Sequence, residues 1–341
     1  MSKKIVRRTQ VSTTHLPDNL TETVKQIYAS RGMNSAEELE LNVARLQGMA
    51  DDTTLMGIDN ACQLLHLALL NKKRMIIVGD FDADGATSTA LMMTALNLFG
   101  STHHDFIVPN RFEYGYGLTP EIVDLAAIQK AQMLITVDNG ISCIAGVKRA
   151  KDLGMQVIVT DHHLPGHSLP IADAIVNPNQ HGCNFPSKAL AGVGVAFYLM
   201  LALRKYCREK NYFAEQGIAE PNIAQLLDLV ALGTVADVVS LDANNRILVA
   251  QGLKRIRAGQ TRPGIQALIE IANKNQKRLV ASDFGFALGP RINAAGRLDV
   301  MSFGINCLLA SDFSSAGVMA AGLADLNKAR LKIEPGGQVE D

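Results

Sequence analysis

The chain has 341 residues, of which 48% are hydrophobic and 19% charged, and these values exclude a wholly disordered or fibrous protein. Lysine plus arginine and aspartate plus glutamate both total 33, so any binding to nucleic acid must depend on a local basic patch. The five cysteines form no CxxC pair, which argues against a structural zinc site or a disulfide framework. No apolar stretch follows the basic start MSKKIVRRTQ, and the uncharged run 189–203 is shorter than the roughly 20 residues that span a bilayer. We therefore expect a cytoplasmic protein with no membrane partner.

The predicted elements change in character along the chain. Residues 1–70 form a helical extension with amphipathic stretches at 21–30 and 60–70. Strands are predicted at 75–80, 104–110, 133–140, 155–163 and 174–179, separated by helices at 86–100, from Pro120 onward and at 142–154. After about residue 187 only helices are predicted, at 189–210, 221–232, 244–258, 263–274, 302–310 and 312–334. This order predicts an α/β protein with a parallel sheet flanked by helices and a helix-rich C-terminal half.

Acidic residues directly follow three of the predicted strands. They are Asp80, Asp82 and Asp84 after the first strand, Asp138 after the third, and Asp161 with His162 and His163 after the fourth. In open parallel sheets ligands bind at the carboxyl ends of the strands, so these side chains are expected to converge. Crowded carboxylates repel one another, and one or two divalent metal ions would remove that repulsion. Any one cluster alone could be a helix N-cap or a turn, but all three in register favour a metal site.

The composition of this cluster indicates its chemistry. Carboxylates with a minority of imidazole and no nearby thiolate suit Mn²⁺, with Mg²⁺ an alternative. Two such ions about 3.5–4 Å apart, bridged by a carboxylate, would activate water and hold a phosphoryl group for in-line displacement. We therefore predict metal-assisted hydrolysis of a phosphoester or phosphoanhydride. The sequence lacks GxxxxGK[ST], HExxH and GxSxG motifs, and Gly192 and Gly194 are interpreted as helix-packing residues.

Several strings resemble known families. GDFDADGATSTAL, TVDNG, VTDHH and ALGTVADVV resemble the four motifs of the DHH phosphoesterase superfamily. PNRFEYGYGL, NFPSKALAGVGVAFYL, GPRINAAGRLD and QIYASRGMNSAEELE are similar to the RecJ family of bacterial single-strand-specific 5′→3′ DNA exonucleases. The resemblance reaches about residue 334. It implies an N-terminal helical extension over 1–70, a DHH catalytic domain over 71–310 with its sheet part ending near 186, and the start of a truncated linker helix over 311–341.

The resemblance also implies roles for individual residues of the site. It assigns a pair of Mn²⁺ or Mg²⁺ ions to Asp82, Asp84, Asp138, His162 and Asp237, with Asp138 as the bridging ligand. His163, Asp80 and Asp161 are the candidate catalytic residues, and His163 is expected to support the ligands or to face the phosphate. The assignment of Asp237 as a metal ligand rests on the resemblance alone, because its position after an apolar helix would otherwise indicate an N-cap or a turn.

Candidate DNA contacts lie in two further strings. Nine lysines and arginines stand between residues 250 and 300 against three acids, which is typical either of a solvated helix face or of a phosphate-binding surface. By resemblance, Arg291 binds the 5′-terminal phosphate, and Asn293 and Arg297 of GPRINAAGR contact DNA. Arg111 is expected on the path of the strand, with Phe112, Tyr114 or Tyr116 as a stacking partner.

The RecJ resemblance implies that the substrate is single-stranded DNA with a 5′ end, hydrolysed to 5′-mononucleotides by two-metal water attack. The implied setting is recombinational repair and mismatch-repair excision, with a single-strand-binding protein or a helicase as partner. One alternative is a DHH hydrolase of small phosphoanhydrides or oligonucleotides, which the RecJ-like helical half disfavours. A second is a non-catalytic remnant that binds DNA or a partner, which the intact candidate ligands disfavour.

Overall fold

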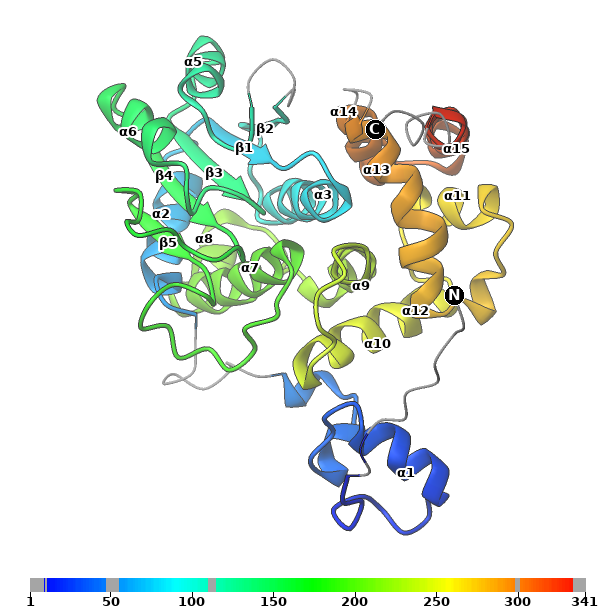
Figure 1. Cartoon of the computed structure of the whole chain (residues 1–341). Helices are drawn as coiled ribbons and strands as arrows, with labels where there is room; N and C mark the ends of the chain where they lie inside the picture. The colour runs from blue at the N-terminus through cyan, green and yellow to red at the C-terminus, as the bar shows by residue number, and fades with distance from the viewer. Residues whose placement is uncertain (1–8, 10, 47–54, 110–114, 298–300, 334–341) are drawn as a thin grey trace, which may run out of the picture.

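A computed structural model describes residues 9, 11–46, 55–109, 115–297 and 301–333. Its centre is a five-stranded sheet with the order β2-β1-β3-β4-β5, in which all neighbouring strands run parallel (Figure 1). The strands are β1 (Met75–Gly79), β2 (His104–Ile107), β3 (Met133–Val137), β4 (Gln156–Thr160) and β5 (Ala174–Val176). The parallel sheet and all five predicted strands are therefore confirmed.

Helices cover both faces of this sheet. On one face, α5 (Pro120–Ile128) and α6 (Ile144–Asp152) pack against Ile76, Leu134 and Val157. The other face packs in the main core, with Ile77 and Ile135 among its residues. The helices there are α2 (Ile58–Leu70), α3 (Ala83–Leu98) and α7 (Gly192–Glu209). Because both faces are covered, β1 and β3 are continuous apolar runs rather than alternating ones.

The C-terminal half is helical among the described residues. Its α-helices are α8 (Tyr212–Gln216), α9 (Leu227–Ala236), α10 (Ala243–Arg257), α11 (Pro263–Ile271), α12 (Ala281–Asp283), α13 (Gly289–Arg297), α14 (Met301–Leu309) and α15 (Phe313–Ile333). Shorter turns are η4 (Ile223–Leu226), η5 (Gln276–Arg278) and the π-helical η6 (Phe284–Leu288). Helix α9 lies inside this half and packs against α3, α7 and α10, while α15 packs against α11 and α13.

The predicted helices of this half are confirmed with shifted ends. The segment predicted at 221–232 begins as η4 and continues as α9 to Ala236. The continuous helical path through η6 and α13 was not predicted, because the string GFALGPRINAAGR contains three glycines and a proline. Tertiary packing overrides these weak helix formers, since Gly289 and Gly296 press against neighbouring segments.

The N-terminal region forms a small unit of its own. Helix α1 (Glu22–Ala29) is followed by the 3-10 turns η1 (Ala36–Leu39) and η2 (Val43–Arg45). Arg246 of α10 forms an ion pair with Glu38, and this joins the unit to the helical half. Helix α2 lies in the range predicted as the extension, and it packs against α7 and β5 in the main core. No helix of the described residues has the length and apolar character needed to cross a membrane.

Candidate active site

The acidic side chains gather at the carboxyl edge of the sheet, where β1, β3 and β4 end next to one another. Strand order changes direction between β1 and β3, which is where open parallel sheets bind ligands. Asp82 is the N-cap of α3, and its Oδ1 accepts a hydrogen bond from the Gly85 N–H at 2.9 Å. Asp84 lies in the first turn of the same helix, Asp138 follows β3 and His162 follows β4.

These side chains form one continuous cluster, which we call the donor cluster. It contains three groups whose donor atoms lie within 4.8 Å of one another: Asp80, Asp82 and Asp138; Asp84, His162 and Asp237; Asp138, His162 and His163. Asp138 belongs to two groups and joins the carboxylates that follow β1 to the histidines that follow β4. This position fits the bridging role that the resemblance implies for it.

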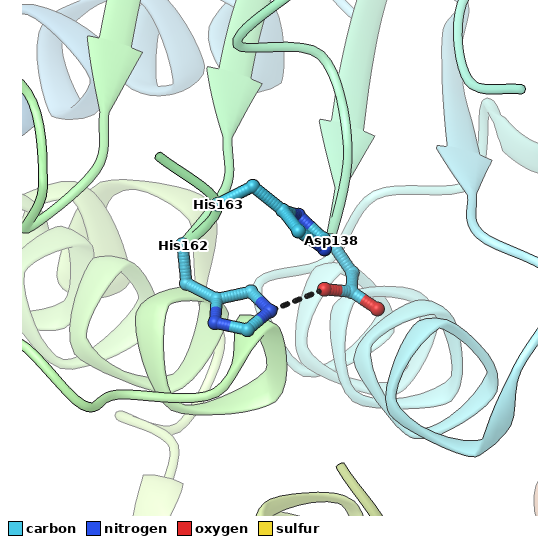
Figure 2. Close-up of side chains that lie close together, drawn as sticks. All are labelled: Asp138, His162 and His163. Atoms are coloured by element: carbon cyan, nitrogen blue, oxygen red, sulfur yellow. Dashed lines mark ion pairs between the residues drawn. The ribbon is translucent and has the colours of Figure 1, made fainter. Parts of the chain in front are cut away.

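The donor atoms converge closely enough to count as ion pairs, yet no hydrogen bond joins them. His162 Nε2 lies 3.1 Å from Asp138 Oδ1 (Figure 2) and 3.5 Å from Asp237 Oδ2. All three atoms are buried, and none of them makes a hydrogen bond to a described residue. Buried polar atoms in native proteins nearly always have a partner. Unpartnered carboxylate oxygens and one imidazole nitrogen, all directed at one space, fit Mn²⁺ or Mg²⁺.

The electrostatics of the cluster point to the same conclusion. Burial, together with the charge of Asp237, raises the pKa of Asp84 well above its usual range, and burial with the charge of Asp84 does the same to the pKa of Asp138. Burial and the charge of Asp82 raise the pKa of Asp80, and separately that of Asp237, to about 7. Ionised forms of these groups therefore need positive charge nearby.

Asp84 is held by the start of α7. Its Oδ2 accepts a hydrogen bond from the Gly192 N–H at 2.6 Å, and its Oδ1 accepts one from the Val193 N–H at 3.0 Å. The N-terminus of a helix favours negative charge, so α7 offsets part of the burial cost of this carboxylate. A side chain at Gly192 would reach the cluster itself, because a Cβ there would lie 2.6 Å from Asp138 Oδ1.

The two histidines are set to different protonation states. Asp161 Oδ1 accepts a hydrogen bond from His163 Nδ1 at 2.7 Å, which raises the pKa of His163 to about 9. Burial would raise the pKa of Asp161, but the hydrogen bonds from His163 and from the Ile141 N–H hold it below its usual range. Burial and the neighbouring His163 charge lower the pKa of His162 to about 4, so His162 is neutral and suited to bind a metal.

Asp237 reaches the cluster from the helical half. It is the C-cap residue of α9, which packs closely on α3 because Gly233 has no side chain: a Cβ there would overlap Thr87 Oγ1 and lie 2.9 Å from Asp84 Oδ1. Sequence pattern alone missed this residue, since no strand precedes it. The available signal was an acid at the end of a largely apolar helix that contains an internal glycine.

The chain is similar to known proteins over most of its length. The model of the DHH family, N-terminal domain, matches residues 74–234. Over 335 residues the chain is 58% identical to the single-stranded-DNA-specific exonuclease RecJ of Dickeya dadantii (strain 3937), covering 98% of this chain and 58% of that protein. A crystal structure of exonuclease RecJ bound to manganese is 35% identical with a TM-score of 0.71, and the match covers 83% of this chain and 68% of that one. The chain belongs to the RecJ family.

A second RecJ structure, from Thermus thermophilus in complex with Mn²⁺, is 32% identical with a TM-score of 0.74. That match covers 91% of this chain and 42% of the Thermus chain. The RecJ resemblance seen in the sequence is thus confirmed, and this chain spans 58% of the length of the Dickeya relative.

The residues expected to contact DNA fall into different environments in this RecJ-family chain. Tyr116 lies beside the donor cluster, with its ring centroid 6.2 Å from that of His163. Asn293 Oδ1 accepts a hydrogen bond from the Ala83 N–H at 2.7 Å and so ties α13 to the start of α3. Arg291 Nη1 donates to the Ala287 carbonyl at 2.5 Å. Arg111, Phe112 and Tyr114, and the side chain of Arg297, lie outside the described residues.

Part of the basic excess between residues 250 and 300 is paired within the fold. Arg262 forms a buried ion pair with Asp228 at 3.0 Å, and Lys274 pairs with Asp283 at 2.8 Å. Arg257 Nε donates to the Leu279 carbonyl at 2.7 Å. These three side chains serve the fold, which leaves a smaller basic surface than the sequence count indicates.

The metal-free chain is expected to lose stability between pH 6.5 and 8. Burial favours the protonated forms of Asp80 and Asp237. Their contribution to the stability of the folded chain is therefore complete below pH 3.8 and is lost as the pH rises through about 7. His163 acts in the same direction, because its stabilisation is complete below 6.5 and is lost as pH rises through about 9. His162 contributes in the opposite direction, but its effect on stability falls below this window, between pH 6.5 and about 4.

Calorimetric melting of the EDTA-treated chain at pH 6.5 and 8 measures this loss. Mn²⁺ should raise the Tm more at pH 8, where the carboxylates are ionised and bind it without releasing protons. An increment in Tm that is equal at both pH values would contradict the assignment of these carboxylates as metal ligands.

Proposed function

We propose that this chain is a metal-dependent exonuclease that hydrolyses single-stranded DNA from a 5′ end and releases 5′-mononucleotides. The observation that carries the proposal is the donor cluster, with unpartnered oxygens of Asp138 and Asp237 facing His162 Nε2. Relatives in the family are named single-stranded-DNA-specific exonucleases, and two solved RecJ structures hold manganese. The donor set supports Mn²⁺ or Mg²⁺ as the cofactor of this chain as well.

Two divalent ions in the cluster would supply a nucleophile from water at neutral pH and neutralise charge on the phosphodiester. Asp82, Asp84, Asp138, His162 and Asp237 would hold them. The residues of this chain do the rest: the N-terminus of α7 orients Asp84, and burial keeps His162 neutral.

His163 is suited to donate a proton to the leaving 3′-oxygen of the terminal nucleotide. Its ring is held by Asp161, its pKa of about 9 keeps it protonated at neutral pH, and 46% of its side chain is exposed. It lines a pocket of about 450 Å³ together with Asp80, Tyr116 and Ser142. A pocket of this size accommodates one nucleotide beside the donor cluster.

Nuclease assays of this 341-residue chain test the proposal against its main alternative. With Mn²⁺ present, a 5′-phosphorylated single strand should yield 5′-mononucleotides, while duplex DNA, pyrophosphate and dinucleotides should be poorer substrates. Preferential hydrolysis of pyrophosphate or dinucleotides would instead show a hydrolase of small substrates. Binding of single strands without turnover in any metal would show a DNA-binding remnant.

Arg291→Ala is expected to reduce the preference for a 5′-phosphorylated end by about 1–3 kcal/mol, through the loss of a charge-assisted contact. Burial lowers the pKa of Arg291, and its Nε makes no hydrogen bond to a described residue, so the guanidinium retains donors for a phosphate. The ratio of kcat/KM for 5′-phosphate and 5′-hydroxyl substrates measures the effect, with Arg291→Lys as a partial replacement. Equal losses on both substrates would assign Arg291 to the fold or to the strand path.

We also propose that this activity serves recombinational repair and mismatch-repair excision in the cytoplasm. A single-strand-binding protein or a helicase would supply the single strand there. Pull-down of the chain with each candidate, with and without DNA, tests for such partners.

A further inference from the structure

Phe286 is the most exposed large hydrophobic side chain of the described residues. It is 87% exposed, whereas Phe284, two positions earlier, is completely buried. Removing such a ring from water by packing it against another apolar surface is favourable, so a phenylalanine exposed to this degree is suited to contact a partner.

The local helix geometry accounts for this exposure. Phe286 lies in the π-helical turn η6, and Pro290 follows four residues later. Proline has no N–H to donate to the carbonyl four residues back, and its ring crowds that carbonyl. The helix widens at this point, and wide turns of this kind are frequent at functional sites.

The same helix is fixed to the donor cluster. A Cβ at Gly289 would lie 3.1 Å from Ala236, next to Asp237, and Asn293 accepts the hydrogen bond from Ala83 between Asp82 and Asp84. Phe286 precedes Asn293 by seven residues on the same helical path, which runs from η6 into α13. Phe286 therefore lies within about 10 Å of Asn293 along the helix axis, the length that seven residues span in an α-helix.

The charge of this segment favours a polyanion. Residues 284–297 contain two arginines and no acid. Aromatic rings together with basic side chains are the combination with which proteins bind single strands, through base stacking and phosphate contacts. The helical path therefore leads from the contact at Ala83 to an exposed ring on a segment that carries two arginines and no acid.

We infer that the Phe286 ring stacks on a base of the single strand, one or more nucleotides beyond the terminal nucleotide that is hydrolysed. This inference rests on the proposed function and deepens it, because it names a position at which the strand is held outside the reacting pocket. The occupant is an unpaired base, and any of the four bases would serve because each has a flat face.

Binding of a 5′-phosphorylated 12-mer with phosphorothioate linkages, measured by fluorescence anisotropy in Ca²⁺, tests the inference without turnover. Phe286→Ala should weaken binding about 5- to 150-fold, the range that loss of one stacked base gives. Phe286→Trp should restore it. Phe313→Ala, which removes an exposed phenylalanine of α15, is the matched control and should bind as the wild type does.

Abasic substitutions then locate the contact. A single abasic nucleotide at the stacked position should weaken binding by the wild type and have no further effect on Phe286→Ala. Unchanged binding by Phe286→Ala, or additive losses at every abasic position, would overturn the inference while leaving the exonuclease proposal intact. A change in oligomeric state of Phe286→Ala would show a protein contact instead and would also overturn it. Failure of the wild type to bind or cleave any single strand would overturn the proposed function itself.

Discussion

Replacement of Asp138 by asparagine should abolish hydrolysis and the binding of both metal ions, and should nevertheless raise the Tm of the metal-free chain at pH 8. Asp138 is shared by two donor groups, so its loss removes a ligand from each. The loss of metal affinity should exceed the about 10–100-fold that removal of an outer hydrogen-bonding partner of a ligand typically causes. The gain in Tm follows because burial and the charge of Asp84 disfavour the ionised Asp138 side chain.

Asparagine suits this test because Asp138 has a φ of 63°. Among residues other than glycine, asparagine tolerates this left-handed conformation well, so backbone strain does not obscure the result. Isothermal titration with Mn²⁺ gives the stoichiometry, and melting at pH 4 and 8 gives the sign of the stability change. Asp124→Asn, which breaks a surface ion pair with Arg149, is the control. Full metal stoichiometry in Asp138→Asn would contradict the bridging assignment.

Gly192→Ala is expected to remove activity through a single methyl group. The new Cβ would lie 2.6 Å from both Cβ and Oδ1 of Asp138, so either α7 or the carboxylate must move. Overpacking of this kind costs about 1–3 kcal/mol in stability. The shift would also disturb the Gly192 N–H contact to Asp84, so metal affinity should fall together with stability.

Gly194→Ala provides the matched control in the same helix. The three atoms nearest to its Cβ would all belong to the side chain of Leu190, the first at 3.0 Å, and the end of that side chain can move. Because alanine is about 1 kcal/mol better than glycine inside a helix, this variant should be neutral or more stable. Titration with Mn²⁺ and thermal melting of the two variants separate a packing defect from a defect of the site. Equal Mn²⁺ affinity and equal Tm of the two variants would mean that α7 can shift at Gly192 without disturbing the site.

The sheet and the strand-end acids could be predicted because they follow from local patterns. MIIVG and MLITV are apolar runs that end in acids, and parallel pairing of adjacent strands places those acids at one edge. Nothing more than strand order was needed to bring Asp138 close to Asp82.

Features that depend on packing between distant segments could not be predicted from local patterns. Asp237 joins the cluster only because Gly233 lets α9 approach α3. Gly192 was interpreted as a helix-packing residue, and its close approach to Asp138 became visible only in three dimensions. The helix from Phe284 to Arg297 forms despite its glycines and proline, since Asn293 and Gly296 pack against the segment before α3.

The donor cluster draws its side chains from residues 80 to 237, and this separation has a consequence for how the site assembles during folding. Contacts between distant segments form only after long loops have closed, and loop closure costs conformational entropy. The complete set of donors can therefore assemble only late in folding. During synthesis from the ribosome, the first strand and its acids emerge well before α9 delivers Asp237. A partly made chain therefore has the acids that follow β1 but lacks the complete donor cluster until α9 has formed. Metal bound by the assembled donors would stabilise the folded chain. Because these donors are far apart in sequence and meet late in folding, the metal would slow unfolding more than it would speed folding.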